Sequence, residues 1–158
     1  TGSQIAVTVP RQSEKRCIAN MRVLRRKIEI QTSQVQRNQL LRELLENEFN
    51  LSNISLSDFD FSGLDLSGVD FLETDFKNAI FLKTDLRLAQ NLTQQQFIDK
   101  NPPLLCNSPL PADINVKGGK DRDCGQMATA LLERYPVTFE TLAEAEAFAE
   151  DQRQKVWE

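Results

Sequence analysis

Large apolar residues recur at every fifth position between Phe49 and Leu88, without a gap. The eight pentads of this stretch read FNLSN, ISLSD, FDFSG, LDLSG, VDFLE, TDFKN, AIFLK and TDLRL. A period of five fits neither the 3.6-residue period of an α-helix nor the two-residue alternation of a flat strand. A regular repeat of this kind predicts a solenoid, in which the chain winds through successive coils of similar shape.

The pattern resembles the pentapeptide-repeat family, whose motif is a small residue, then Asp or Asn, then Leu or Phe, then two loosely specified residues. The second position of the pentads is usually Asp, and the third is always Leu or Phe: Leu51, Leu56, Phe61, Leu66, Phe71, Phe76, Phe81 and Leu86. The resemblance covers forty of the 158 residues. It implies a β-solenoid, a right-handed quadrilateral β-helix with four pentads to a coil, and therefore about two coils.

With four pentads to a coil, residues twenty apart are expected to stack at about the 4.8 Å spacing of neighbouring strands. Leu51 would then lie on Phe71, and Phe61 on Phe81. The first pentad position also points inward, and it is bulkier in the first coil than in the second: Phe49, Ile54, Phe59 and Leu64, then Val69, Thr74, Ala79 and Thr84. Because the family usually has Ala there, we expect the first coil to be splayed and its end to be covered.

Helices are predicted on both sides of the repeat. Residues 11–47 contain neither Pro nor Gly, and apolar residues recur among them at helical spacing. A cap is needed because the strand edges and apolar interior of an open solenoid would recruit other chains. The predicted order is a tail at 1–10, N-terminal helices capping the solenoid at 11–48, the repeat at 49–90, an exit helix at 91–101, a cysteine-bracketed loop at 102–124, and a C-terminal helical hairpin at 125–158 that covers the other end.

Helix starts are predicted from capping boxes, in which Ser or Thr is followed three residues later by Glu or Gln. Three such pairs occur: Ser33 with Gln36, Thr93 with Gln96, and Thr141 with Glu144. Asp123 is predicted to cap a further helix, which stops before Pro136. One face of the last helix is expected to consist of Leu142, Ala145, Phe148, Ala149 and Val156.

The three cysteines bear on the compartment. Cys106 and Cys124 bracket a loop rich in Pro and Gly, which has little core of its own. A disulfide that closes a loop of this length stabilises a fold by about 3 kcal/mol. The sequence fits such a disulfide better than two free thiols, and a disulfide would indicate an oxidising compartment. Cys17 would then be left over, as a buried and unreactive thiol on an apolar helical stripe.

An apolar patch is predicted on the outward face of the second coil. The fourth pentad position is Ser throughout the first coil, but it becomes Leu72 and Leu82 in two pentads of the second. Ile80 also replaces the usual Asp of the second position. Either the C-terminal helices of this chain pack over Ile80 and Leu82, or the patch is a docking surface for a partner.

A basic helix near the N-terminus is the second candidate surface. Residues 1–40 carry eight Lys and Arg against two acidic residues, whereas residues 41–99 carry four against eleven. The candidates for contact with an anionic lipid surface or an acidic protein are Arg22, Arg25, Arg26 and Lys27. A solvated helix face explains the same run. Nucleic acid is not expected, because the run lacks interleaved aromatic residues.

Catalysis and metal binding are not expected. The chain has no His, and the repeat Asp residues occupy one solvent-facing position, where turns and sheet edges use them. Asp65 and Asp85, one coil apart, make at most a weak calcium site. The Gly118-Gly119 pair lacks the strand–helix context of a phosphate loop, and three scattered cysteines without His make a poor zinc site. We therefore expect no enzyme and no cofactor.

The resemblance implies fold more strongly than function, since the pentapeptide-repeat family includes DNA mimics and assembly factors. The run NLTQQQF and the cysteine-bracketed loop are also similar to the tails of members from cyanobacteria and the chloroplast thylakoid lumen. These similarities imply a non-catalytic interaction protein, namely an accessory subunit or assembly factor that docks on a photosynthetic membrane complex. The implied compartment is the thylakoid lumen, with the periplasm as the second choice. The alternative is a DNA-mimicking topoisomerase inhibitor, for which two coils are short. No apolar run approaches the roughly 18 residues of a transmembrane helix.

Overall fold

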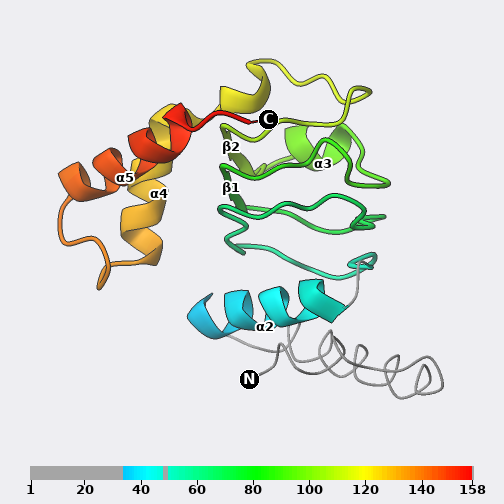
Figure 1. The fold of residues 1–158 in the computed structure, drawn as a ribbon, viewed down its shortest axis with the longest axis horizontal. Helices are drawn as coiled ribbons and strands as arrows, with labels where there is room; N and C mark the ends of the chain where they lie inside the picture. Colours follow the sequence, from blue (N-terminus) through cyan, green and yellow to red (C-terminus); the bar gives the residue numbers. More distant parts are fainter. Residues whose placement is uncertain (1–33, 48–49, 158) are drawn as a thin grey trace.

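The structure is a computed structural model, and it describes residues 34–47 and 50–157 (Figure 1). Its elements in chain order are α2 (Gln34–Asn47), β1 (Ile80–Leu82), α3 (Gln95–Ile98), β2 (Leu104–Cys106), the 3₁₀ helix η3 (Gly119–Asp121), α4 (Cys124–Arg134) and α5 (Leu142–Gln154). The predicted tail and first helix lie outside the described residues. Ser33 and Phe49 lie outside them too.

Residues twenty apart pair in parallel along the repeat. Five single bridges have this spacing: Asn50 with Asp70, Ser55 with Asp75, Asp60 with Ile80, Asp65 with Asp85, and Asp70 with Gln90. Backbone hydrogen bonds accompany them, such as the one from the N–H of Leu51 to the carbonyl of Asp70 at 2.9 Å. The predicted twenty-residue stacking is therefore present. The handedness and the four-sided cross-section of the coils stay predictions.

The third pentad residues form the core of the repeat. All eight are at most 2% exposed, and the rings of Phe61 and Phe81 stack with centroids 4.9 Å apart, as predicted. The first position is also buried at Ile54, Phe59, Val69, Thr74, Ala79 and Thr84. The two buried threonines satisfy their hydroxyls by donating to backbone carbonyls of the preceding coil, Thr74 to Leu51 at 2.7 Å and Thr84 to Phe61 at 2.8 Å.

A residue with left-handed backbone ends each of the first seven pentads. Their φ angles lie between 55° and 80°, at Asn53, Asp58, Gly63, Gly68, Glu73, Asn78 and Lys83. The second residue of the pentad supports this turn: in six pentads its side-chain oxygen accepts a hydrogen bond from the backbone N–H of the fourth residue. The interpretation of the repeat Asp residues as turn residues is therefore confirmed.

Replacing Glu73 by Gly is expected to stabilise the protein. Glu73 is exposed and has a φ of 57°, a conformation that costs an L-residue roughly 1–2 kcal/mol and costs Gly almost nothing. We expect the E73G variant to gain about 1 kcal/mol in the free energy of unfolding, measured by urea denaturation. The E73A variant removes the same charge but keeps the strained turn, so equal stability of the two variants would contradict this account.

The first coil is covered by α2, which crosses one end of the stacked turns in Figure 1. Leu41 of this helix is fully buried in the core of the repeat, and Leu40 and Leu45 pack against that core. This burial protects the apolar end of the first coil from solvent, and it is the arrangement expected from the bulky residues there.

The hydrogen-bonded stacking continues beyond Gln90, where the pentads end. Strand β2 pairs with β1 in parallel, with Ile80 opposite Leu104. The separation of these partners is 24 residues rather than twenty, because α3 lies between them along the chain. Further on, the N–H of Leu86 donates to the carbonyl of Pro109 at 3.0 Å. Another turn of chain, of irregular sequence, therefore lies on the second coil.

Helix α3 is attached to the second coil by Gln96. The side-chain amide of Gln96 donates to the backbone carbonyls of Phe71 at 3.0 Å and Thr74 at 2.9 Å. Its side-chain oxygen accepts a hydrogen bond from the N–H of Thr93 at 2.8 Å. Of the predicted capping box, the bond from the Thr93 N–H to Gln96 therefore forms, but α3 has no side-chain cap at its start.

The far end of the repeat is closed by α3 and the loop after β2. Phe97, Ile114 and Val116 from these segments are buried in the same core as the pentads. The prediction that the C-terminal hairpin covers this end was wrong. Helices α4 and α5 instead pack at the side of the repeat, in a second apolar cluster around Ile80 and Leu82 (Figure 1). The error arose because the loop supplies apolar residues of its own.

The two remaining helix starts differ in their caps. At α5 the hydroxyl of Thr141 accepts a hydrogen bond from the N–H of Glu144 at 3.2 Å, as predicted. Asp123 precedes α4, but its carboxylate makes no bond to that helix. It accepts instead from the N–H of Leu105 at 3.0 Å and pairs with Arg122 at 2.8 Å. The predicted side-chain cap is therefore wrong, because β2 and Arg122 hold the carboxylate.

Candidate interaction surface

Ile80 and Leu82 lie under the C-terminal hairpin formed by α4 and α5. Both side chains are fully buried, in one cluster with Met127 and Leu131 of α4 and Ala149 of α5. They are therefore not a free docking surface, and the candidate role of these two residues is corrected. The other interpretation holds, since this chain's own helices cover the apolar face of β1.

Tyr135 ties the hairpin to two other parts of the molecule. Its hydroxyl donates to the carboxylate of Asp60 in the repeat at 2.5 Å and accepts from the side-chain amide of Asn38 in α2 at 3.0 Å. The side-chain oxygen of Asn38 in turn accepts from the N–H of Asp60 at 3.1 Å. Burial, and then the neighbouring Asp60 charge, raise the pKa of Tyr135. The hydroxyl therefore keeps its proton and remains a donor.

The Y135F variant is expected to lose about 1–3 kcal/mol of the free energy of unfolding, because it leaves partly buried partners without their hydroxyl. Chemical denaturation measures this loss. The matched test is a double-mutant cycle with D60N. We expect the two substitutions to be coupled by about 1 kcal/mol, whereas additive effects would show that the hydroxyl and the Asp60 carboxylate do not act together.

Arg134 fastens the same end of α4 to two stacked turns. Its guanidinium donates to the backbone carbonyls of Asn78 and, at 3.5 Å, of Asp58. It also lies 3.9 Å from the Asp58 carboxylate. The Arg134 side chain is only 16% exposed, and this burial lowers the pKa of its guanidinium. Asp58 and Asn78 are twenty residues apart, so one side chain spans successive coils.

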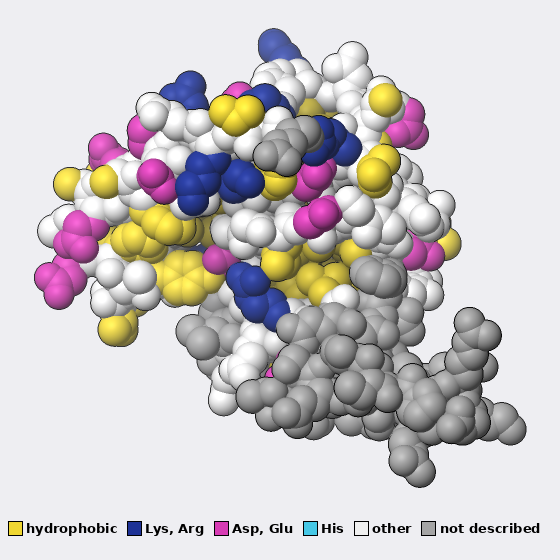
Figure 2. Space-filling view, in the orientation of Figure 1, with side chains coloured by type: hydrophobic (Ala, Val, Ile, Leu, Met, Phe, Trp, Pro, Cys, Tyr) yellow, Lys and Arg dark blue, Asp and Glu magenta, His cyan; other side chains and the backbone are white. Residues whose placement is uncertain are grey.

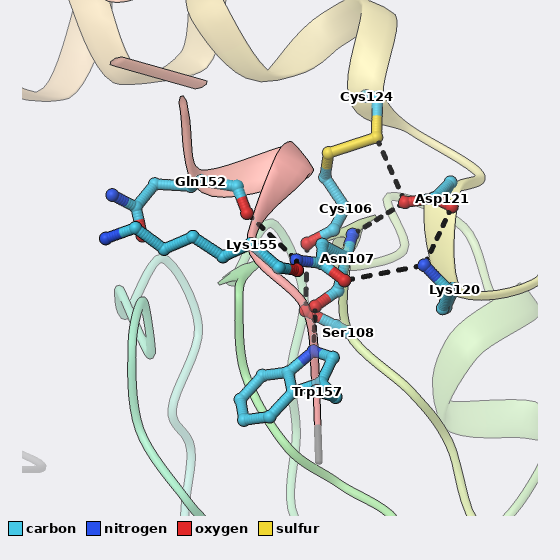
Figure 3. A network of polar contacts seen from close by, with 9 residues as sticks. All are labelled: Cys106, Asn107, Ser108, Lys120, Asp121, Cys124, Gln152, Lys155 and Trp157. Atoms are coloured by element: carbon cyan, nitrogen blue, oxygen red, sulfur yellow. Dashed lines mark hydrogen bonds and ion pairs between the residues drawn. A yellow bond between two sulfur atoms is a disulfide. The ribbon is translucent and has the colours of Figure 1, made fainter. Parts of the chain in front are cut away.

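Asn107, which directly follows β2, binds the C-terminal tail, residues 155–157 (Figure 3). Its side-chain amide donates to the backbone carbonyls of Gln152 at 2.9 Å and Lys155 at 2.7 Å. Its N–H donates to the carboxylate of Asp121 at 2.9 Å, and its carbonyl accepts from the indole of Trp157 at 2.9 Å. Carbonyls at the end of α5, which the helix cannot satisfy itself, thereby find donors.

Trp157 docks on the repeat through two cations. The ammonium of Lys83 lies 3.5 Å from the centroid of the indole ring, and the guanidinium carbon of Arg87 lies 5.8 Å from it. These are cation–π distances. Arg87 also pairs with Asp85 at 2.8 Å, and this hydrogen bond lowers the pKa of Asp85. The tail therefore lies on the last pentads rather than reaching outward.

The predicted disulfide between Cys106 and Cys124 is present. It joins the end of β2 to the start of α4, beside Asn107 (Figure 3). Cys17, the third cysteine, lies outside the described residues. The disulfide thus fixes the hairpin to the turn of chain that closes the repeat.

Leu72 is the member of the predicted patch that stays accessible. Its side chain is 45% exposed, at the edge of a groove of about 330 Å³ between the repeat and the loop after β2. We call this the Leu72 groove; it is lined by Leu72, Ala89, Asn91, Leu92, Thr93, Pro111 and Asp113. Leu88 is more exposed, at 70%, but does not line the groove.

The hairpin carries further apolar side chains at its surface (Figure 2). In α5, Ala145 and Ala149 are buried as predicted, but Leu142 and Phe148 of the same predicted face are about 40% exposed. Val156 lies beyond the end of α5, so the predicted face does not extend to it. The helix therefore packs with its small residues and presents its large ones to solvent.

The basic candidate surface of Arg22, Arg25, Arg26 and Lys27 lies outside the described residues, and its contacts stay predictions. Among the helices that the structure describes, none is both long enough and apolar enough to span a membrane.

Residues 50–89 match the family model for pentapeptide repeats, in eight copies. This segment therefore consists of pentapeptide repeats, as its pentads predicted. Such repeats form β-helices in general, and the proteins that carry them are generally non-catalytic and often mediate protein interactions. No curated protein and no solved structure matches the chain. The looser similarity to cyanobacterial and thylakoid-lumen members has no support from these comparisons.

Three residues that organise the hairpin were missed in the sequence: Asn38, Asn107 and Tyr135. Asn38 and Tyr135 are 97 positions apart, and no local pattern links them. A weak signal existed for Asn107, which follows Cys106 directly and has a left-handed φ of 48° that Asn tolerates better than most residues. The geometry of the C-terminal tail was therefore beyond local sequence reasoning.

Proposed function

We propose that the protein is a non-catalytic accessory subunit or assembly factor that docks peripherally on a larger membrane complex. The observation that carries this proposal is the Leu72 groove. It is an accessible surface with a mixed apolar and polar lining, on a scaffold that α2, the hairpin and the C-terminal tail hold together. What distinguishes Leu72 from the more exposed Leu88 is its position at the edge of this groove, where a partner side chain would contact both the leucine and the groove.

The disulfide supports docking in an oxidising compartment, because disulfides persist in oxidising compartments and are rare in reducing compartments. A thylakoid lumen is the compartment we propose, with the periplasm second. The basic run at Arg22, Arg25, Arg26 and Lys27 would add contact with anionic lipid or an acidic flank of the partner. If reversing the charges of Arg25 and Arg26 leaves membrane association unchanged, the proposed contact through the basic run is wrong.

The proposal is tested by comigration under native conditions. A mild-detergent extract of cells that express the tagged chain is separated by size, and the chain is located by mass spectrometry. We expect it to comigrate with a membrane complex. Recovery as a free small species would contradict the accessory-subunit role, and inhibition of a DNA topoisomerase by the purified protein would favour the alternative function.

The Leu72 groove is tested in the same assay with a matched pair of variants. L72D places a charge at the groove, and L88D places the same charge on an exposed leucine outside it. We expect L72D to reduce the comigrating fraction by at least about tenfold, equivalent to about 1.4 kcal/mol of binding energy, and L88D to leave it unchanged. Equal behaviour of the two variants would show that the partner docks elsewhere.

A further inference from the structure

Three potential metal ligands from separate elements meet beside the hairpin. Cys106 ends β2, Asp121 lies in η3, and Cys124 begins α4. Their two sulfurs and a carboxylate oxygen all lie within 4.8 Å of one another, and Figure 3 shows the carboxylate directed at the disulfide. In the structure the two sulfurs are bonded to each other, so the set can bind a metal only after reduction.

The carboxylate is held in place by partners of its own. One oxygen of Asp121 accepts from the N–H of Asn107 at 2.9 Å and lies 3.6 Å from the sulfur of Cys124. The other oxygen pairs with the ammonium of Lys120 at 3.1 Å. Metal-binding side chains are commonly oriented by such outer hydrogen bonds. Asp121 is therefore positioned toward the sulfurs without any contribution from a metal.

Of the three residues, Asp121 and Cys124 are partly exposed to solvent and Cys106 is buried. They line a groove of about 920 Å³ between α4 and α5, together with residues such as Gly125, Ala128 and Glu146. Solvent therefore reaches the site past Asp121 and Cys124. An ion could enter by this route, and a water molecule could supply a fourth ligand.

We propose that Cys106, Asp121 and Cys124 form a zinc site when their disulfide is reduced. A dithiol transfers two electrons and two protons to the disulfide, which gives two thiols and the disulfide of the reductant. Zn²⁺ then displaces both thiol protons, which pass to solvent, and binds two thiolates and the carboxylate. Two sulfurs, one oxygen and a water make a tetrahedral set of the kind that zinc accepts.

The site gives the fold a cross-link in both redox states. Reduction alone would remove the covalent link between α4 and β2 and leave two thiols beside a carboxylate. Zinc restores the link between the same elements and offsets two of the three negative charges of the ligands. Because zinc binds the deprotonated ligands, its affinity for the site is expected to fall as the pH falls.

Cobalt binding to the full chain tests the site. The protein, carrying C17A to remove the third thiol, is reduced anaerobically by a phosphine, which is converted to its oxide with oxygen from water and competes little for metal. Titration with Co²⁺ is expected to give thiolate-to-cobalt absorption that saturates at one equivalent, and Zn²⁺ is expected to displace it. The oxidised protein is expected to give no such absorption, and the same absorption from it would overturn the proposal.

Asp121 is tested with a matched pair of variants, D121N and D113N, where Asp113 is an exposed acid of the same loop. We expect D121N to weaken cobalt binding at least about tenfold and D113N to leave it unchanged. Circular dichroism of the oxidised D121N protein checks its fold. Equal affinity of D121N and D113N, or absence of thiolate absorption from the reduced protein, would overturn the proposal.

Thermal unfolding gives a second readout that does not depend on the cobalt spectrum. Zn²⁺ at about 100 times its dissociation constant is expected to raise the melting temperature of the reduced protein by about 5 °C or more, and to leave that of the oxidised protein unchanged. Should the reduced protein unfold without metal, zinc is expected to refold it. No effect of zinc on the reduced protein would contradict the site.

Discussion

The F61A variant is expected to lose about 3–5 kcal/mol of the free energy of unfolding. Phe61 is fully buried, and its ring contacts those of Phe71, Phe76 and Phe81 with centroids 4.9 to 6.4 Å apart. Alanine would leave a cavity between stacked coils that cannot collapse, because the backbone hydrogen bonds between coils fix their spacing. Urea denaturation followed by circular dichroism measures the loss.

The control for this substitution is L88A, which shortens a large apolar residue of the same repeat that is 70% exposed. Exposed positions of this kind usually change stability by less than about 0.5 kcal/mol. A similar loss for F61A and L88A would mean that the third pentad position does not carry the core of the repeat.

Removal of the disulfide is expected to cost about 3 kcal/mol, since Cys106 and Cys124 close a loop of 18 residues. The C106A/C124A protein should therefore unfold at a clearly lower urea concentration than the oxidised wild type. A chelator is present throughout, so that no metal can replace the bond. The loss of stability is expected because the unfolded chain gains conformational freedom when the bond is absent. The contacts of the hairpin in the folded protein should remain at low urea concentration.

Chemical reduction provides the internal control for that variant. Reductant should lower the unfolding midpoint of the wild type to about that of C106A/C124A, and it should leave the variant unchanged. A wild-type midpoint that does not respond to reductant would show that the bond between β2 and α4 does not stabilise the protein.

The stacking of the repeat was predictable because a five-residue period determines which side chains point inward. Each pentad places one Leu or Phe inward and one turn residue at the corner, so local sequence specifies which residues meet twenty positions later. The pairing of Asp60 with Ile80 and the stacking of Phe61 on Phe81 follow from that count alone. The same holds for Thr141, whose capping role depends on a residue three positions away.

The position of the hairpin could not be predicted in this way. Ile80 and Leu82 indicated an apolar face on the repeat. The hydrophobic pattern of the sequence does not say whether this face is covered by the same chain or by a partner. The deciding contacts join Tyr135 to Asp60 and Arg134 to Asn78, which are polar pairs far apart in the sequence. Each residue alone is compatible with a solvated surface.

Competition between partners explains the errors at single residues. Asp123 has the sequence position of a helix cap, yet the N–H of Leu105 and the guanidinium of Arg122 take its carboxylate. An ion pair together with a bond from a backbone N–H outweighs the single hydrogen bond that a helix cap would supply. Asp121 was missed as a potential ligand for a related reason, since only the fold brings it next to Cys106 and Cys124.

The central claim is that this chain docks on a larger complex. Photocrosslinking at the Leu72 groove is its most direct test. A photoreactive amino acid replaces Leu72 in one protein and Leu88 in another, each is expressed in cells, and the native extract is irradiated. The account predicts a specific adduct from position 72, with a component of a membrane complex, and none from position 88. No adduct from position 72, or the same adducts from both positions, would contradict it.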